Sequence, residues 1–203
     1  MPTTTSLPAP LRRHFDRHGP LRARELQARG VSRVQAARWV AGGVLQRLAR
    51  GLYAPAHYEP NEHIALVAVA RRAPQTVFCL LTALRLHELT TQAPFEVWVA
   101  LPAKARVPRL DWPPLRVTRF SEPTLAAGLE TRRIDGVALR VTSVAKTVAD
   151  CFKFRNKVGL DVALEALREV CRARRASNEE LWRYARLCRV ESVMRPYMEA
   201  IAG

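Results

Sequence analysis

The stretch 19–55, GPLRARELQARGVSRVQAARWVAGGVLQRLARGLYAP, decides the fold of the first part of the chain. It predicts two helices, one over 21–29 and one that begins after the N-cap Ser32 and runs to Ala41. Gly30 closes the first of them, because glycine takes the left-handed conformation that commonly follows a helix. Two short helices separated by a tight turn indicate a helix-turn-helix unit.

A basic β-hairpin follows the second helix. Gly42-Gly43 ends the helix, and the segments 44–48 and 51–54 alternate like strands around Ala49-Arg50-Gly51. Helix, turn, helix and hairpin in this order are typical of a winged helix-turn-helix, which places its second helix in the major groove of DNA. We therefore expect such a domain over residues 1–58, with a further helix over 7–18.

Charge favours an anionic partner for this segment. The 203-residue chain has a net charge of +15, and within residues 1–55 ten arginines stand against Asp16 and Glu25, which leaves +8. An Arg-rich proteome would explain the preference for arginine over lysine, but it would not explain this clustering. Double-stranded DNA is the partner that we expect.

The second predicted helix has two faces. Ala36, Trp39 and Val40 share one side, and we assign that side to the core because an exposed tryptophan is costly. Arg33 and Arg38 then share the outer side with Val34, Ala37 and Ala41. The opposite assignment, with Trp39 against DNA, is the alternative.

The predicted DNA contacts differ in their roles. Arg33 and Arg38 are expected to pair with bases, Gln35 with a base or a phosphate, and the others with the backbone or the minor groove. The set is Arg22, Arg24, Ser32, Arg33, Gln35, Arg38, Arg47 and Arg50. Two alternatives stay open, namely that these arginines form a solvated face or that the winged helix is a protein-interaction module.

Residues 59–203 predict an α+β domain with a helical tail. Asn61 is expected to cap a helix that ends at Arg72, and Ser143 to cap another over 144–154. The remaining expected helices cover 82–88, 159–174, 177–188 and 190–201, and the expected strands cover 95–101, 115–120 and 137–142. The apolar stripe of the first tail helix is expected to be Leu160, Ala163, Leu164 and Leu167.

No pattern of catalytic, cofactor or metal-binding residues is present in the sequence, so we expect neither an enzyme nor a cofactor. His14 and His18 are spaced i, i+4, but no third metal ligand accompanies them. Four cysteines are expected to be free thiols, mostly buried: Cys79, Cys151, Cys171 and Cys188.

A degenerate nuclease is the enzymatic alternative. Its candidate acids are Glu96, Asp111, Glu122 and Asp135, although none is followed by a Glu-x-Lys pattern. Asp150 is spaced to pair with Lys146 and Lys153 on one helix, which we interpret as a helix-surface or interdomain ion pair. Mutually distant Asp111, Asp135 and Asp150 would exclude the nuclease.

The sequence also bears on localisation. Residues 1–10 lack an apolar run after a basic start, so no signal peptide is expected. The longest apolar stretches are far shorter than the ~20 residues of a membrane-spanning helix. We therefore expect a cytoplasmic protein without a membrane partner.

Several segments together resemble the AbiEi family of antitoxins, which belong to bacterial type IV toxin–antitoxin systems linked to abortive phage infection. They are GVSR at 30–33, WVAGGVLQRLARGLY at 39–53, TALRLHEL at 82–89, FEVWVALP at 95–102, DGVALRVTSVAKTVADC at 135–151 and GLDVALEAL at 159–167. The resemblance implies an N-terminal winged helix that binds inverted repeats in its own promoter and represses it. It also implies a C-terminal domain that counteracts an AbiEii-like nucleotidyltransferase toxin without a stable protein complex. The alternative within the family is a regulator without a toxin.

Overall fold

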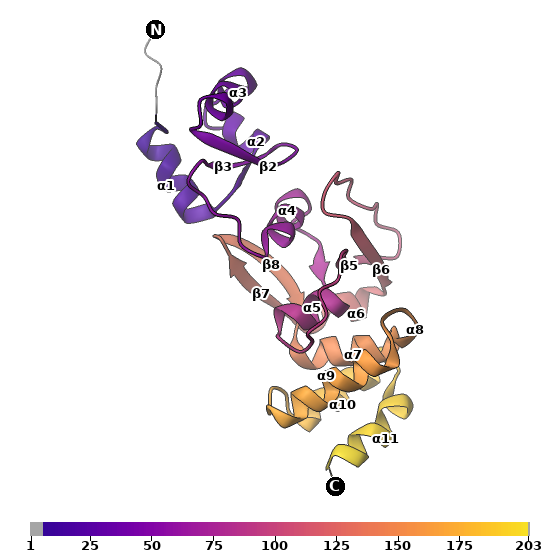
Figure 1. Cartoon of the computed structure of the whole chain (residues 1–203). Coiled ribbons are helices and arrows are strands. Elements are labelled where there is room, and N and C mark those ends of the chain that lie inside the picture. Colours follow the sequence, from indigo (N-terminus) through magenta and orange to yellow (C-terminus); the bar gives the residue numbers. More distant parts are fainter. Residues whose placement is uncertain (1–5, 203) are drawn as a thin grey trace. The chain divides into compact units, whose positions relative to one another are not determined.

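The computed structural model describes residues 6–202 as a mixture of helices and β-sheet, which agrees with the expected α+β class. The chain divides into two compact units, whose elements are labelled in Figure 1. The first unit runs to Gln75 and also includes residues 108–113 and 132–139, and the second contains the remainder. The expected division into 1–58 and 59–203 stays a prediction. Part of the segment in which no signal peptide is expected, residues 1–5, lies outside the described residues.

The first unit begins with the expected helices and hairpin. Its elements are α1 (Ala9–His18), β1 (Leu21–Arg22), α2 (Ala23–Gln27), α3 (Arg33–Ala41), β2 (Leu45–Ala49), β3 (Leu52–Pro55) and α4 (Ile64–Arg72). The prediction of helix from residue 21 was wrong, because Leu21 and Arg22 pair with β3 as a short strand. Leu21 is fully buried there and is paired with Tyr53 of β3. A small sheet results, in the order β1-β3-β2.

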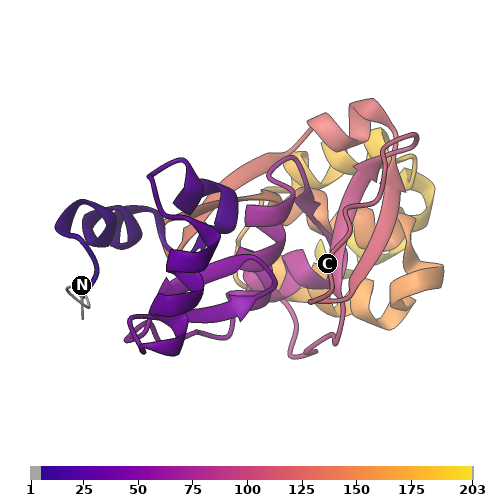
Figure 2. The same ribbon diagram turned by 90° about the horizontal axis from the view of Figure 1, so that it is seen from above.

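A separate apolar core holds these elements together. Phe15 of α1, Leu26 of α2, Trp39 of α3 and Leu45 of β2 are all buried in one cluster with Leu21. Each helix contributes large side chains from one face only, which leaves its other face to solvent. Figure 2 shows α1, α2 and α3, in indigo and purple, from a second direction.

A polar contact fixes the segment that follows β3. Asp135 lies at the turn between β7 (Leu129–Ile134) and β8 (Val137–Thr142). It accepts hydrogen bonds from the hydroxyl of Tyr58 and from Nδ2 of Asn61, the latter at 3.1 Å. The prediction that Asn61 caps a helix was wrong. Its Oδ1 accepts from the backbone N–H of His63 instead, and α4 begins only at Ile64.

The main sheet has the strand order β6-β5-β4-β8-β7. Its strands are β4 (Val77–Phe78), β5 (Val97–Pro102), β6 (Leu115–Phe120), β7 (Leu129–Ile134) and β8 (Val137–Thr142), with α5 (Leu80–Leu86) and α6 (Glu122–Ala126) between them. β4 runs parallel to β8 and antiparallel to β5. The expected strands are present, whereas β4, α6 and β7 were missed. β7, with the sequence LETRRI, has no fully buried side chain, so it gives no clear apolar alternation.

The helical tail closes the second unit. It consists of α7 (Val144–Lys153), α8 (Arg155–Val158), α9 (Leu160–Arg172), α10 (Asn178–Cys188) and α11 (Glu191–Ala202). α7 contacts α5, α9, α10 and α11, and residues 145–152 of α7 are all buried.

Two sequence predictions on this tail need correction. Ser143 stands at the N-cap of α7, but its hydroxyl makes no capping bond and has no partner among the described residues. Leu160 is 37% exposed, so it does not belong to the buried stripe. The buried face of α9 consists of Val162, Ala163, Ala166, Leu167 and Val170. At 100° per residue, Leu160 lies at the edge of this face, on the same side as the half-buried Leu164.

Candidate nucleic-acid interface

The helix α3 is fixed at its start and along its inner face. The Ser32 hydroxyl accepts a hydrogen bond of 3.1 Å from the backbone N–H of Gln35, which caps the helix as predicted. Ala36 and Trp39 are only 4% and 7% exposed. The assignment of Trp39 to the core is thereby confirmed.

The outer face of α3 combines positive charge with small or apolar side chains. Arg33, Val34, Ala37, Arg38 and Ala41 are all exposed, and Val34 is 63% exposed. Gln35 is half-buried, at the boundary that its position on the helix predicted. Neither Arg33 nor Arg38 donates a side-chain hydrogen bond within the described part of the chain. Both guanidinium groups are therefore available to an external acceptor.

The β2–β3 hairpin presents two further arginines. Arg47 is exposed, and its Nε lies 3.4 Å from the carbonyl oxygen of Ala49. Arg50 stands in the turn, where one guanidinium nitrogen lies 3.4 Å from Oδ2 of Asp111. The two side chains of this pair are 79% and 67% exposed, so the pair is a solvated one. Asp111 is a partner that sequence reasoning did not assign to Arg50.

A hollow of about 610 Å³ lies between α2, the start of α3, the hairpin turn, α4 and residues 109–112, all within the first unit. Four of the arginines that line it belong to the helix-turn-helix and hairpin: Arg22, Arg24, Arg33 and Arg50. Three more come from later in the chain: Arg71, Arg72 and Arg109. Among the described lining residues the one carboxylate is that of Asp111. The hollow is therefore strongly positive.

The predicted contacts Arg22 and Arg24 lie in different surroundings. Arg24 is exposed, whereas Arg22 is half-buried and donates to the carbonyl oxygen of Arg71 at 3.3 Å. Glu25 accepts from the backbone N–H of Arg22 at 2.7 Å and from the guanidinium of Arg71 at 3.1 Å. Burial lowers the pKa of Arg22, and the nearby guanidinium groups of Arg24 and Arg72 lower it further. Arg22 thus also helps to fix α4 to the helix-turn-helix.

Arg71, Arg72 and Arg109 were not predicted from the sequence as members of this positive surface. A weak signal existed for the first two, because adjacent arginines end the apolar stretch of α4. Nothing local distinguishes Arg109, which is brought to the hollow by the fold and whose carbonyl oxygen accepts from Nε of Arg72 at 3.1 Å.

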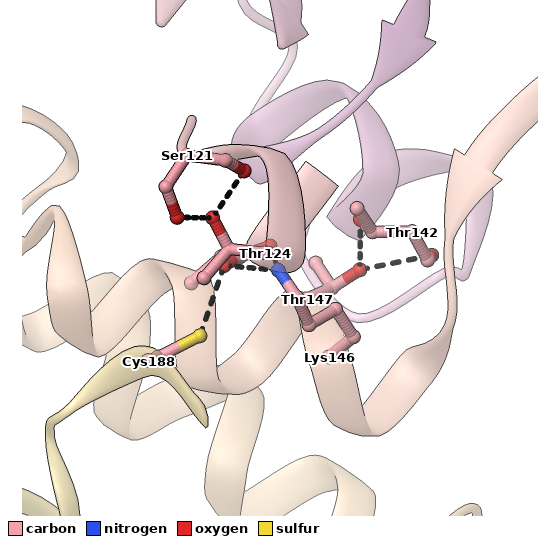
Figure 3. Close-up of polar contacts among 7 residues, drawn as sticks. Ser121, Thr124, Thr142, Lys146, Thr147 and Cys188 are labelled. Atoms are coloured by element: carbon pink, nitrogen blue, oxygen red, sulfur yellow. Dashed lines mark hydrogen bonds and ion pairs between the residues drawn. The ribbon is translucent and has the colours of Figure 1, made fainter. Parts of the chain in front are cut away.

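A buried polar cluster occupies the second unit (Figure 3). Nζ of Lys146 donates to both carboxylate oxygens of Asp150 at 2.5 Å, and both side chains are fully buried. The thiol of Cys188 donates to Oδ1 of Asp150 at 3.3 Å, and Lys146 Nζ lies 4.8 Å from the centre of the Phe120 ring. Burial raises the pKa of Asp150, and Lys146 opposes that rise. The prediction of a helix-surface or interdomain pair was wrong, because the face of α7 that carries the pair packs into the core of its own unit.

Neighbouring threonines extend the polar interior of the second unit. The hydroxyls of Thr142 and Thr147 are 2.7 Å apart, and Thr147 also donates to the carbonyl oxygen of Thr142 at 3.1 Å. Nε2 of His87 is hydrogen-bonded to that same carbonyl oxygen at 2.6 Å. These bonds satisfy buried polar groups where β8 turns into α7, so they are structural.

The acids considered for a nuclease do not form one cluster. Asp111 pairs with Arg50, Asp135 with Tyr58 and Asn61, and Asp150 with Lys146. Glu96 lies 3.8 Å from Arg116, and Glu122 is in the first turn of α6. Within residues 6–202, no group of three or more His, Cys, Asp or Glu side chains could hold a metal ion.

The histidines and cysteines have ordinary structural environments. The rings of His14 and His18 are packed with their centroids 4.2 Å apart. The four cysteines are free; Cys79, Cys151 and Cys188 are buried, as expected, and Cys171 is half-buried. Burial raises the pKa of each of these thiols, which disfavours the reactive thiolate form.

None of the helices in the described part of the chain has the length and apolar character needed to cross a bilayer. No curated protein matches the chain. The match to a family model ends at residue 56, so the resemblance of the later segments stays a prediction. Residues 10–56, which contain α1, α2, α3 and the β2–β3 hairpin, match the family described as transcriptional regulator, AbiEi antitoxin.

Proposed function

We propose that the N-terminal part of the chain is a winged helix-turn-helix that binds double-stranded DNA, with α3 in the major groove and the β2–β3 hairpin as the wing. The observation that carries the proposal is the exposed face of α3, where Arg33 and Arg38 have no partner within residues 6–202 while Trp39 is buried on the other side. A helix with this division between faces can enter the groove without unfolding the core behind it.

The outer face suits direct recognition of bases. Arg33 and Arg38 can each donate two hydrogen bonds to a guanine. Ala37 lies between them and is small enough for close approach, and the exposed Val34 offers an apolar contact for a thymine methyl group. Gln35, at the edge of this face, supplies an additional base or phosphate contact.

Other residues are proposed to hold the DNA backbone. Ser32 and the first N–H groups of α3 suit a phosphate, because the start of a helix carries partial positive charge. Arg24, in α2, and Arg47, in β2, are both exposed and are proposed to contact flanking phosphates. Arg50 must exchange the carboxylate of Asp111 for a phosphate before it contributes.

At the biological level we propose an autoregulating repressor that is the antitoxin of a type IV system and acts in the cytoplasm. Its DNA target would be inverted repeats in its own promoter, bound by the domain 1–58. The domain 59–203 would counteract an AbiEii-like nucleotidyltransferase toxin without a stable complex. The match at 10–56 supports the regulator and antitoxin class, and the downstream resemblance supports the toxin partner.

The deciding experiment compares promoter binding by the wild type and by the double variant Arg33→Ala/Arg38→Ala. Each lost base contact should cost about 1–3 kcal/mol, so specific binding in a gel-shift titration should fall by about 30-fold or more. Both side chains are exposed, so the variant should unfold at the wild-type temperature. A matched control removes two exposed arginines of the second unit, Arg106→Ala/Arg168→Ala, and should leave specificity intact. Wild-type affinity of the first variant for its own promoter would refute the groove assignment.

The antitoxin role needs its own test. The same double variant should still protect cells that express a nucleotidyltransferase encoded next to this chain, because the two activities are proposed to reside in different domains. Loss of protection in a folded variant would contradict that separation. Absence of protection by the wild type would refute the antitoxin role and leave a regulator without a toxin.

A further inference from the structure

The positive surface of the first unit is not confined to the segment that matches the regulator family. Arg71 and Arg72 end α4, and Arg109 lies in the segment 108–113, yet all three line the same hollow as Arg24 and Arg33. These residues lie beyond residue 56, where the family match ends. A second set of cations therefore adjoins the start of the proposed recognition helix.

The fold fixes the backbone of these added cations. Nε of Arg72 donates to the carbonyl oxygen of Arg109 at 3.1 Å, which ties the end of α4 to the 108–113 segment. Arg71 donates to Glu25 at 3.1 Å and to the carbonyl oxygen of His18, which ties α4 to the helix-turn-helix. The backbone around the hollow is thus preorganised, and binding of a ligand need not order it.

Positive charge in the hollow exceeds what its own acids can neutralise. Arg71 is paired with Glu25 and Arg50 with Asp111, but no hydrogen bond or ion pair within the described residues engages the guanidinium groups of Arg24, Arg33 or Arg109. Several unpaired guanidinium groups around one hollow repel each other and attract a polyanion. Such an arrangement favours phosphate oxygens, which accept the paired donors of arginine.

We propose that the hollow holds backbone phosphates of the DNA duplex that α3 reads, so that Arg72 and Arg109 extend the DNA interface beyond the helix-turn-helix and its hairpin. The inference rests on the proposed DNA binding. Continuity favours a duplex as the source of the phosphate, because Arg33 belongs both to the outer face of α3 and to the lining of the hollow. The half-exposed Trp112 and the apolar Leu48 give the same hollow a surface for the sugar.

The test measures the salt dependence of binding to a short mixed-sequence duplex by fluorescence anisotropy. Each phosphate contact contributes about 0.9 to the slope of log K against log salt concentration. Arg72→Ala/Arg109→Ala should therefore reduce the slope by about 2 and weaken binding about tenfold at moderate salt. Arg106→Ala/Arg168→Ala removes the same charge from the second unit and should leave the slope unchanged.

The single variant Arg109→Ala separates the loss of a phosphate contact from a loss of structure. The side chain of Arg109 has no partner among the described residues, and its carbonyl oxygen survives substitution, so Arg109→Ala should leave the structure intact. It should reduce the slope by about 1. Slopes equal to that of the wild type in both hollow variants would overturn the inference while leaving the proposed function in place. A wild type that binds no duplex would instead refute the proposed function itself.

Inorganic pyrophosphate distinguishes a free ligand from DNA. If the hollow serves a free polyphosphate, pyrophosphate should raise the melting temperature of the wild type in a saturable manner but not that of Arg72→Ala/Arg109→Ala. That result together with unchanged salt slopes would overturn DNA as the source of the phosphate. Reduced salt slopes of the hollow variants, without specific stabilisation of the wild type by pyrophosphate, support DNA as the source of the phosphate.

Discussion

Two ion pairs, one in each unit, place the same kinds of charge in opposite environments. Lys146 and Asp150 are fully buried on α7, at 2.5 Å, with Cys188 as a further donor. Arg50 and Asp111 are 3.4 Å apart and largely exposed to solvent. Charges removed from water must remain paired, whereas exposed charges exchange one partner for another at little cost.

These opposite environments determine where each unit has charged groups available to bind other molecules. In the second unit, Lys146 and Cys188 are hydrogen-bonded to Asp150 inside the core, and Thr142 is hydrogen-bonded to Thr147 (Figure 3). These groups therefore hold the fold and are not available to a ligand. In the first unit Arg24, Arg33 and Arg109 are exposed, and no hydrogen bond or ion pair within the described residues engages their guanidinium groups. Charge is structural in one case and free to bind in the other.

The largest expected effect comes from breaking the buried pair. Asp150→Ala leaves Lys146 charged in an apolar interior, so the free energy of unfolding should fall by about 3–5 kcal/mol in a urea titration. The double variant Lys146→Met/Asp150→Leu removes both charges and should recover most of that loss. A cost below about 1 kcal/mol for Asp150→Ala would show that the pair is not buried as described.

An intermediate effect is expected where the first unit is tightly packed. Gly136 has a φ of +72°, and an added Cβ would lie 2.6 Å from the carbonyl oxygen of Arg17. Gly136→Ala should therefore cost about 1–3 kcal/mol, measured by thermal unfolding. Gly30 is a matched control, since its φ is +80° but nothing lies within 4 Å of the added Cβ. Equal costs at the two positions would mean that backbone strain alone matters and that the β7–β8 turn does not pack tightly there.

Features that depend on a local pattern of residues could be predicted from the sequence. The faces of α3 followed from the large, apolar Trp39 on one side and two arginines on the other, and the structure confirms them. Strands with apolar alternation, such as β8, were predicted with the correct bounds. Local patterns of this kind determine secondary structure and burial at the same time.

Other features depend on contacts that are distant in the sequence. Asp150 was expected near a surface because its spacing from Lys146 is also that of a surface pair, and burial of the pair is decided by helices that follow much later. The pairing of Arg50 with Asp111 spans 61 residues and leaves no local pattern. β7 was missed because its charged residues conceal the alternation of a strand.

The smallest expected effect on stability comes from Asp111→Asn, which breaks the exposed pair and keeps Arg50. An exposed pair contributes at most about 1 kcal/mol, so the free energy of unfolding should change by less than about 0.5 kcal/mol. DNA affinity should nevertheless rise about 2- to 5-fold, because Arg50 is released for a phosphate and a negative charge leaves the hollow. Fluorescence anisotropy with the promoter duplex measures the affinity, and Glu169→Gln, which removes the acid of an Arg172 pair in the second unit, serves as the control. An Asp111→Asn variant that bound DNA no more tightly than this control would show that the Arg50–Asp111 pair does not compete with DNA.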